Sequence, residues 1–69
     1  MSETHLIVNG ERRSAAVPST IEQFLLSMKL PPRSVVVEHN GEAVAPSEFA
    51  GRALQTGDRL EVVRIVAGG

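Results

Sequence analysis

The residues with the clearest chemical potential stand at the end of the printed sequence, Val66-Ala67-Gly68-Gly69. Beyond Val66 they carry nothing larger than the methyl group of Ala67, and the four residues would extend about 13 Å from a folded body. Glycine permits backbone angles and close approaches that other residues forbid, which suits a thread that enters a narrow channel in a partner. We therefore expect residues 67–69 to form a flexible Gly-Gly tail on a domain spanning residues 1–66.

If Gly69 is the natural end of the chain, its α-carboxylate is a possible substrate. Attack by this carboxylate on the α-phosphate of ATP would give an acyl-adenylate. A sulfur nucleophile could then displace AMP and leave a thiocarboxylate. The chain has no Cys, so no internal thiol competes for the activated acyl group. The other interpretation of two terminal glycines is an inert flexible end or an expression remnant.

The side chains offer little else for catalysis. His5 and His39 stand far apart without the closely spaced ligands of a metal site, and we expect both to be exposed at strand edges. Glu38 and Glu42 flank a predicted turn, where we expect exposed charges that favour solubility rather than an acid and base pair. The sequence therefore predicts no metal site, no bound cofactor and no catalytic residue.

Composition excludes several classes of function. The 69 residues form one small domain with a net charge of −1 and two aromatic residues, a poor match to a nucleic-acid binder. No apolar run approaches the roughly 20 residues of a membrane span, and Met1 to His5 do not resemble a signal peptide. We expect a cytoplasmic protein whose small core cannot spare a pocket of about 300 Å³ or more.

Short alternating segments predict an α+β fold. His5–Val8 is followed by Asn9-Gly10, a strong hairpin signal, and then by a partner strand over residues 11–17. A second hairpin joins Val35–His39 through Asn40-Gly41 to Glu42–Val44. Ser47 is expected to cap a turn after Pro46, Leu54 lies in a connection, and residues 59–66 form the last strand.

One helix is predicted between these hairpins. Thr20 and Gln23 stand at capping-box spacing, and Pro31-Pro32 is expected to end the helix. The apolar side chains that recur at helical spacing are Ile21, Phe24, Leu25 and Met28. A helix this short must pack on a sheet, and parallel pairing of the first and last strands would give a β-grasp.

Taken in order, these segments resemble the ThiS family of thiamine-biosynthesis sulfur carriers. The resemblance rests on Val8-Asn9-Gly10-Glu11, on residues 35–42 with Val44 and Pro46, and on Gly57-Asp58-Arg59-Leu60-Glu61, together with the end Val66-Ala67-Gly68-Gly69. Phe49 stands where many relatives carry Trp. The resemblance implies a ubiquitin-like β-grasp with a mixed four- to five-stranded sheet and one main helix.

The resemblance also implies the chemistry and the partners. An E1-like enzyme would adenylate Gly69 with ATP and Mg, and a cysteine desulfurase would supply sulfur for the thiocarboxylate. Thiazole synthase would then receive that sulfur, and this protein would be a cosubstrate without catalytic residues. Gly68 and Gly69 carry the family's tail directly.

The last strand predicts a docking surface beside the tail. If Leu60 and Val62 face the core, alternation places Val63 and Ile65 on the other face, where they would join residues 66–68 in binding partners. A twist or bulge that buries Val63 and Ile65 is the alternative.

Three other functions remain open at this point. They are the small sulfur-carrying subunit of molybdopterin synthase, a ubiquitin-like protein modifier joined to lysines, and an adaptor with an inert tail. The first shares the fold and the Gly-Gly end, but its members often carry prolines just before the glycines, and residues 64–67 contain none.

Overall fold

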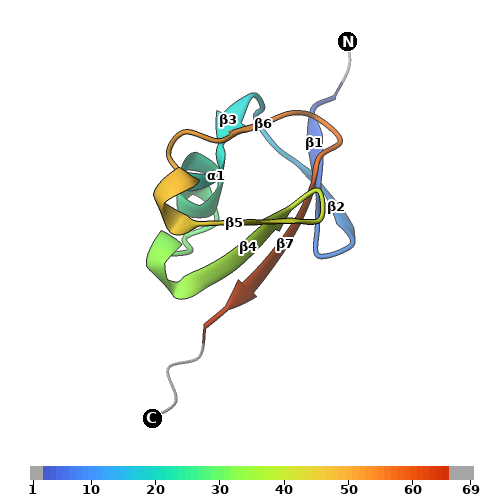
Figure 1. Cartoon of the computed structure of the whole chain (residues 1–69). Helices are drawn as coiled ribbons and strands as arrows, with labels where there is room; N and C mark the ends of the chain where they lie inside the picture. The colour runs from blue at the N-terminus through green and yellow to red at the C-terminus, as the bar shows by residue number, and fades with distance from the viewer. Residues whose placement is uncertain (1–2, 66–69) are drawn as a thin grey trace.

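The computed structural model describes residues 3–65, which form a five-stranded sheet with a helix against one face (Figure 1). In chain order the elements are β1 (His5–Val8), β2 (Glu11–Ser14), β3 (Ser19–Thr20), α1 (Ile21–Ser27), the 3-10 turn η1 (Pro32–Ser34), β4 (Val35–His39), β5 (Glu42–Val44), the 3-10 turn η2 (Pro46–Glu48), β6 (Ala53–Leu54) and β7 (Arg59–Arg64). The sheet order is β2-β1-β7-β4-β5, and β3 pairs separately with β6. Among the strand pairs within residues 3–65, β1–β7 is the only parallel one, as predicted.

Both Asn-Gly turns have the backbone that the sequence predicts. Asn9 and Gly10 have φ values of 51° and 83°, and Asn40 and Gly41 have values of 52° and 85°. Two consecutive residues at positive φ define the type I′ turn, whose twist matches that of paired strands. The two hairpins therefore fix the outer strand pairs of the sheet.

The predicted start of the helix is confirmed. The Thr20 hydroxyl accepts a hydrogen bond from the Gln23 backbone N–H at 3.1 Å, and the Gln23 side chain accepts one from the Thr20 N–H at 2.9 Å. Ile21, Phe24 and Leu25 are buried against the sheet. The reciprocal bonds satisfy two donors at a helix end that would otherwise lack partners.

The predicted end of the helix is wrong. The helix stops at Ser27, before the two prolines, because Lys29 takes a left-handed backbone at φ 60°. The Lys29 N–H donates a hydrogen bond to the Leu26 carbonyl at 3.0 Å, and the Leu30 N–H donates one to the Leu25 carbonyl at 2.9 Å. This pair of bonds is a Schellman motif, which closes the helix without proline.

Four other features of the elements differ from the prediction. Strand β2 ends at Ser14 rather than residue 17, at the His5–Ser14 pair, and one further backbone bond joins the Ala15 N–H to the Thr4 carbonyl at 3.2 Å. Leu54 belongs to β6 rather than to a connection, and no side chain caps η2, although Ser47 was expected to do so. Strand β7 ends at Arg64, and Val66 lies outside the described residues.

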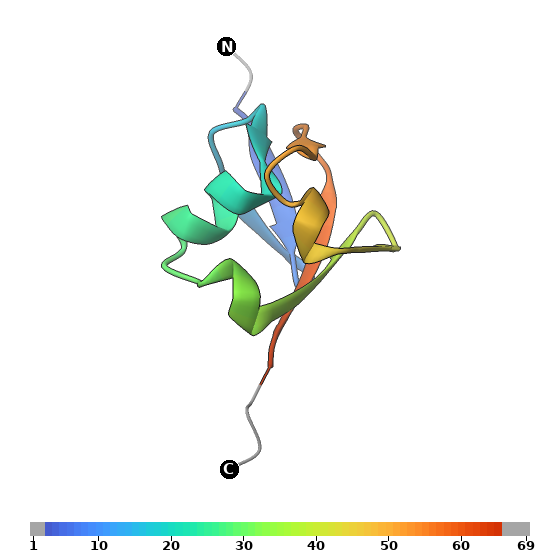
Figure 2. The same cartoon turned by 60° about the vertical axis from the view of Figure 1, so that its left-hand side comes forward.

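The core lies between α1 and one face of the sheet, here called the inner face (Figure 2). The buried hydrophobic residues are Leu6, Val8, Ile21, Phe24, Leu25, Val35, Val37, Val44, Phe49, Leu54, Leu60 and Val62. Alternate strand residues point to the opposite, outer face, which has no helix over it among residues 3–65. The α+β prediction is therefore confirmed.

Candidate functional site

The strand that leads toward the predicted tail occupies the middle of the sheet. Strand β7 runs parallel to β1 on one side and antiparallel to β4 on the other. Its last described bond joins the Ile65 N–H to the Ser34 carbonyl at 2.7 Å. Val66, Ala67, Gly68 and Gly69 lie outside the described residues, so the geometry of the predicted attachment site is not part of the structure. What the structure describes is the rigid element immediately before them.

The outer face of this strand carries exposed apolar side chains. Val63 is 61% exposed and Ile65 is 54% exposed, so neither is buried by a twist or bulge. Val36 on β4 is 52% exposed and stands directly opposite Val63 in the strand register. These three residues form what we call the outer apolar patch. Sequence reasoning missed Val36, although alternation between the buried Val35 and Val37 predicts that it points outward.

A pair of acidic residues borders the patch. Glu38 and Glu61 stand directly opposite each other on the next outward row of β4 and β7. Like charges in directly paired positions repel and weaken a sheet. The outer face therefore presents an apolar surface next to a concentrated negative charge, close to the end of the described chain.

The predicted exposure of His39 is wrong. His39 is 8% exposed because Val35, Val37 and His39 alternate on the inner face of β4. Its Nε2 lies 2.7 Å from Asp58 Oδ2, and its Nδ1 accepts a hydrogen bond from Arg52 Nε at 3.0 Å. Because an arginine can only donate, Nδ1 carries no proton, and Nε2–H donates to Asp58.

The same network stabilises the Asp58 carboxylate. Partial burial raises the pKa of Asp58, but hydrogen bonds from the Gln55 backbone N–H, His39 and Asn40 outweigh it and hold the pKa below its ordinary value of 3.8. Both ring nitrogens of His39 are engaged, which leaves no free lone pair for a general base. The network therefore fixes the turn before β7 and is structural.

The other residues considered for catalysis or metal binding do not lie together in one site. Glu38 faces outward, whereas Glu42 stands opposite His39 and forms an ion pair with Arg52, so the two carboxylates lie on different faces. His5 is half-buried at the start of β1, with its Nδ1 3.3 Å from the Thr56 hydroxyl. Among residues 3–65 no three His, Asp or Glu side chains gather as metal ligands would.

In the same part of the chain, no helix has the length and apolar character needed to cross a membrane.

Comparisons with known proteins identify the family. The model of the ThiS family matches residues 6–69. The crystal structure of the thiamine biosynthesis protein ThiS from Geobacter metallireducens superposes with a TM-score of 0.81 at 28% identity, covering 94% of this chain and 99% of that one. The solution structure of that protein gives a TM-score of 0.78 at 28% identity, with 94% and 87% coverage.

Two curated relatives are thiazole synthases. The one from Paramagnetospirillum magneticum is 39% identical over 64 residues, and the one from Magnetococcus marinus is 34% identical over 62 residues. These alignments cover 93% and 90% of this chain but 20% and 19% of the relatives. The chain thus spans about a fifth of the length of the curated relatives it matches.

The family model matches nearly the whole chain, and the fold matches ThiS over almost the full length of both proteins. The β-grasp expected from the resemblance is confirmed by the same match. The chain therefore belongs to the ThiS family.

Proposed function

We propose that this protein is a sulfur carrier of thiamine biosynthesis. The observation that carries the proposal is the family match, which continues through residue 69 and so includes Gly68 and Gly69. In this function residues 1–66 are the folded domain, and residues 67–69 form the tail that enters a partner's active site. The protein supplies a carboxylate and no catalytic side chain.

The proposed chemistry takes place at the carbonyl carbon of Gly69. A carboxylate oxygen attacks the α-phosphorus of ATP in an E1-like adenylating enzyme, and pyrophosphate leaves. The terminal sulfur of a persulfide, loaded from cysteine by a desulfurase, then attacks the carbonyl carbon, and AMP leaves to give an acyl disulfide. A second thiol attacks the other sulfur of this disulfide, breaks the S–S bond and releases the terminal thiocarboxylate. ATP and Mg act within the partner enzyme.

The proposed recipient of the sulfur is thiazole synthase. Two thiazole synthases contain a stretch that is 39% and 34% identical to this chain within a polypeptide about five times as long. Their combination of a carrier-like segment with a larger remainder supports a working partnership between the two. In this chain the recipient would bind the tail after loading.

The outer apolar patch is the proposed docking face for the adenylating enzyme. Val63 and Ile65 lie immediately before the tail on a rigid strand, so a partner that holds residues 66–69 also meets this surface. Exposed apolar side chains bordered by charge are typical of interaction sites. The Glu38–Glu61 pair predicts that the partner's surface is basic beside its apolar contact.

Intact-mass measurement of the protein from its own cells tests the proposal. A chain ending at Gly69 with one oxygen replaced by sulfur supports the carrier function. Isopeptide conjugates to lysines would indicate a protein modifier, and a mass that includes further residues after Gly69 would exclude the proposed attachment site. Reconstitution with thiazole synthase or with the large subunit of molybdopterin synthase then separates the two carrier pathways.

A further inference from the structure

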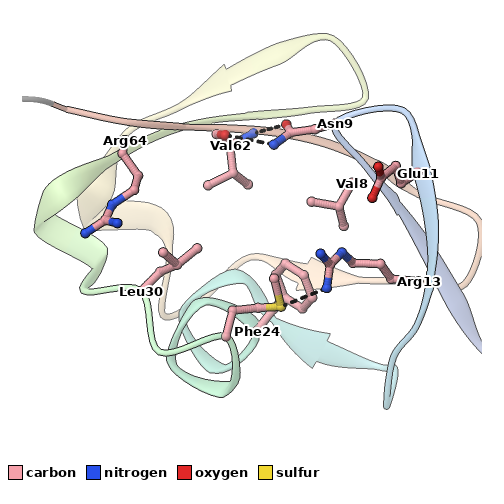
Figure 3. Close-up of a pocket in the computed structure, with 9 residues that line it drawn as sticks. Val8, Asn9, Glu11, Arg13, Phe24, Leu30, Val62 and Arg64 are labelled. Atoms are coloured by element: carbon pink, nitrogen blue, oxygen red, sulfur yellow. Dashed lines mark hydrogen bonds between the residues drawn. The ribbon is translucent and has the colours of Figure 1, made fainter.

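A groove opens on the inner side of the sheet, away from the outer apolar patch (Figure 3). It encloses about 330 Å³ between the start of the β1–β2 hairpin, the end of α1 and strand β7. The lining residues are Val8, Asn9, Glu11, Arg13, Phe24, Met28, Leu30, Val62 and Arg64. Its volume exceeds what the small core was expected to allow, because α1 ends at Ser27 and leaves this end of the inner face uncovered.

The floor of the groove is apolar. Val8 and Val62 come from the sheet, while Phe24, Met28 and Leu30 come from α1 and the turn after it. Met28 and Leu30 are only partly buried, so the groove gives an apolar side chain access to the edge of the core. Burial of one such side chain is the main source of favourable free energy that a surface groove can offer.

Two arginines stand at opposite ends of this floor (Figure 3). Arg13 comes from β2 and Arg64 from the end of β7, and both are exposed. The ion pairs found among residues 3–65 involve His39 and Arg52, not these two guanidinium groups. Arg13 Nη1 contacts only a weak acceptor, Met28 Sδ, at 3.7 Å. Glu11 also lines the groove, two residues before Arg13 on β2, but within residues 3–65 it forms no ion pair with Arg13 or Arg64. Each end of the groove therefore holds a guanidinium group that can bind a carboxylate.

The backbone of β7 beside the groove offers a free edge. Residues 63 and 65 bond toward β4, so the N–H and C=O of Arg64 point to the other edge, past the end of β1. On that edge the side-chain amide of Asn9 bonds to the N–H and C=O of Val62. Within residues 3–65 no backbone hydrogen bond on that edge involves the N–H or C=O of Arg64. An unpaired strand edge next to an apolar groove is the usual template for an extended peptide.

We propose that this groove is a docking site for an extended segment of a partner protein with the pattern acidic–x–apolar–x–acidic. Alternate residues of an extended chain point the same way, so the apolar side chain enters the floor while the carboxylates reach Arg13 and Arg64. The free backbone of Arg64 pairs with the segment. This site lies on the inner side of β7, so a partner can bind here independently of the outer apolar patch.

Titration of the ¹⁵N-labelled protein with acetyl-Asp-Thr-Ile-Thr-Asp-amide tests the proposal by NMR. The amide resonances of Asn9, Met28, Val62 and Arg64 should shift in a saturable way that weakens with added salt. A peptide with Asn at both ends should bind about three- to tenfold more weakly, as loss of two exposed ion pairs predicts. A peptide with Asn in place of Ile should lose binding to the same groove.

Matched variants test which arginine side chains contribute to peptide binding. Arg13→Gln and Arg64→Gln should each weaken binding of the acidic peptide about threefold without affecting the neutral one. Arg12→Gln and Arg59→Gln, which remove the same charge from the opposite face of the same strands, should leave binding unchanged. Equal affinity for acidic and neutral peptides, equal losses in all four variants, or the same shifts with inorganic phosphate alone would each overturn the proposal.

Discussion

The side-chain amide of Asn9 bonds to both backbone polar groups of Val62. Asn9 Nδ2 donates to the Val62 carbonyl at 3.1 Å, and Asn9 Oδ1 accepts from the Val62 N–H at 2.8 Å. The β1–β7 ladder ends at Val8 and Leu60, so this amide replaces the strand residue that would otherwise pair next. An Asn in the first hairpin thus sets the turn and also holds the strand that leads to the tail.

Asn9→Gly should separate these two roles. Glycine accepts the positive φ of the turn, but it leaves both polar groups of Val62 without their protein partner. We expect the free energy of unfolding to fall by about 1–2 kcal/mol, measured by chemical denaturation. Asn9→Asp retains the acceptor but places a carboxylate against the Val62 carbonyl, and it should cost more. A glycine variant as stable as the parent would show that the amide bonds contribute nothing.

Local signals in the sequence were sufficient for most of the fold. The two Asn-Gly pairs determine their hairpins by a positive φ that few other residues accept, and Thr20 with Gln23 determines the start of the helix. The small sheet between β3 and β6 was missed because each strand has two residues, too few to show alternation.

The errors at His39 and Lys29 have different causes. The burial of His39 was readable, since it follows Val35 and Val37 by the period of a strand, but its partners Arg52 and Asp58 are 13 and 19 residues away. The helix end at Lys29 has no sequence signal, because a lysine rarely adopts a left-handed backbone. Long-range pairing and unfavoured local geometry are both set by tertiary packing.

Lys29→Gly should stabilise the protein. Lys29 occupies the left-handed position of the Schellman motif at φ 60°, where a Cβ is unfavourable and glycine is not. We expect a gain of about 0.5–1 kcal/mol in the free energy of unfolding. Lys29→Ala removes the same charge and keeps the Cβ, so it should give no such gain. Equal effects of the two variants would assign the change to the lysine side chain.

Stability should depend on pH through Asp58. Its pKa is lower in the folded state than the ordinary 3.8, so the unfolded chain takes up this proton first as the pH falls. The contribution of Asp58 to the free energy of unfolding is complete at pH values above 3.8, and it disappears at pH values below the pKa of the folded state. Asp58→Asn should cost about 1–2 kcal/mol at neutral pH, and the gap to the parent should close in strong acid.

Urea denaturation of both proteins across the acidic range measures this gap. Glu3→Gln is the matched control, because it removes an exposed carboxylate near the start of the described chain. A gap that stays constant with pH would mean that hydrogen bonds of the neutral group, rather than the carboxylate charge, hold the turn.

Aspartate in the outer apolar patch should block adenylation. Val63→Asp and Ile65→Asp place a charge where we propose that the adenylating enzyme buries apolar surface, so the rate of pyrophosphate release should fall about tenfold or more. Thermal unfolding should show a folded protein, with a cost of up to about 1 kcal/mol.

Leu26→Asp is the control for the patch. Leu26 is 57% exposed on α1, close to the exposure of Val63, but it lies away from the outer face. It should leave adenylation at the parental rate. Unchanged kinetics in both patch variants would exclude this surface as the docking face.

Deletion of Gly69 should abolish sulfur loading in a chain that naturally ends there. The reactive carboxylate would move to Gly68, one residue short of the position that the adenylating enzyme activates. The melting temperature should stay unchanged, because the buried core residues found within residues 3–65 all lie between Leu6 and Val62. Deletion of Ser2, at the other end of the chain, should leave loading intact. Mass spectrometry after incubation with the adenylating enzyme, ATP and a sulfur donor distinguishes the variants, and a truncated protein that still acquired sulfur would refute Gly69 as the attachment site.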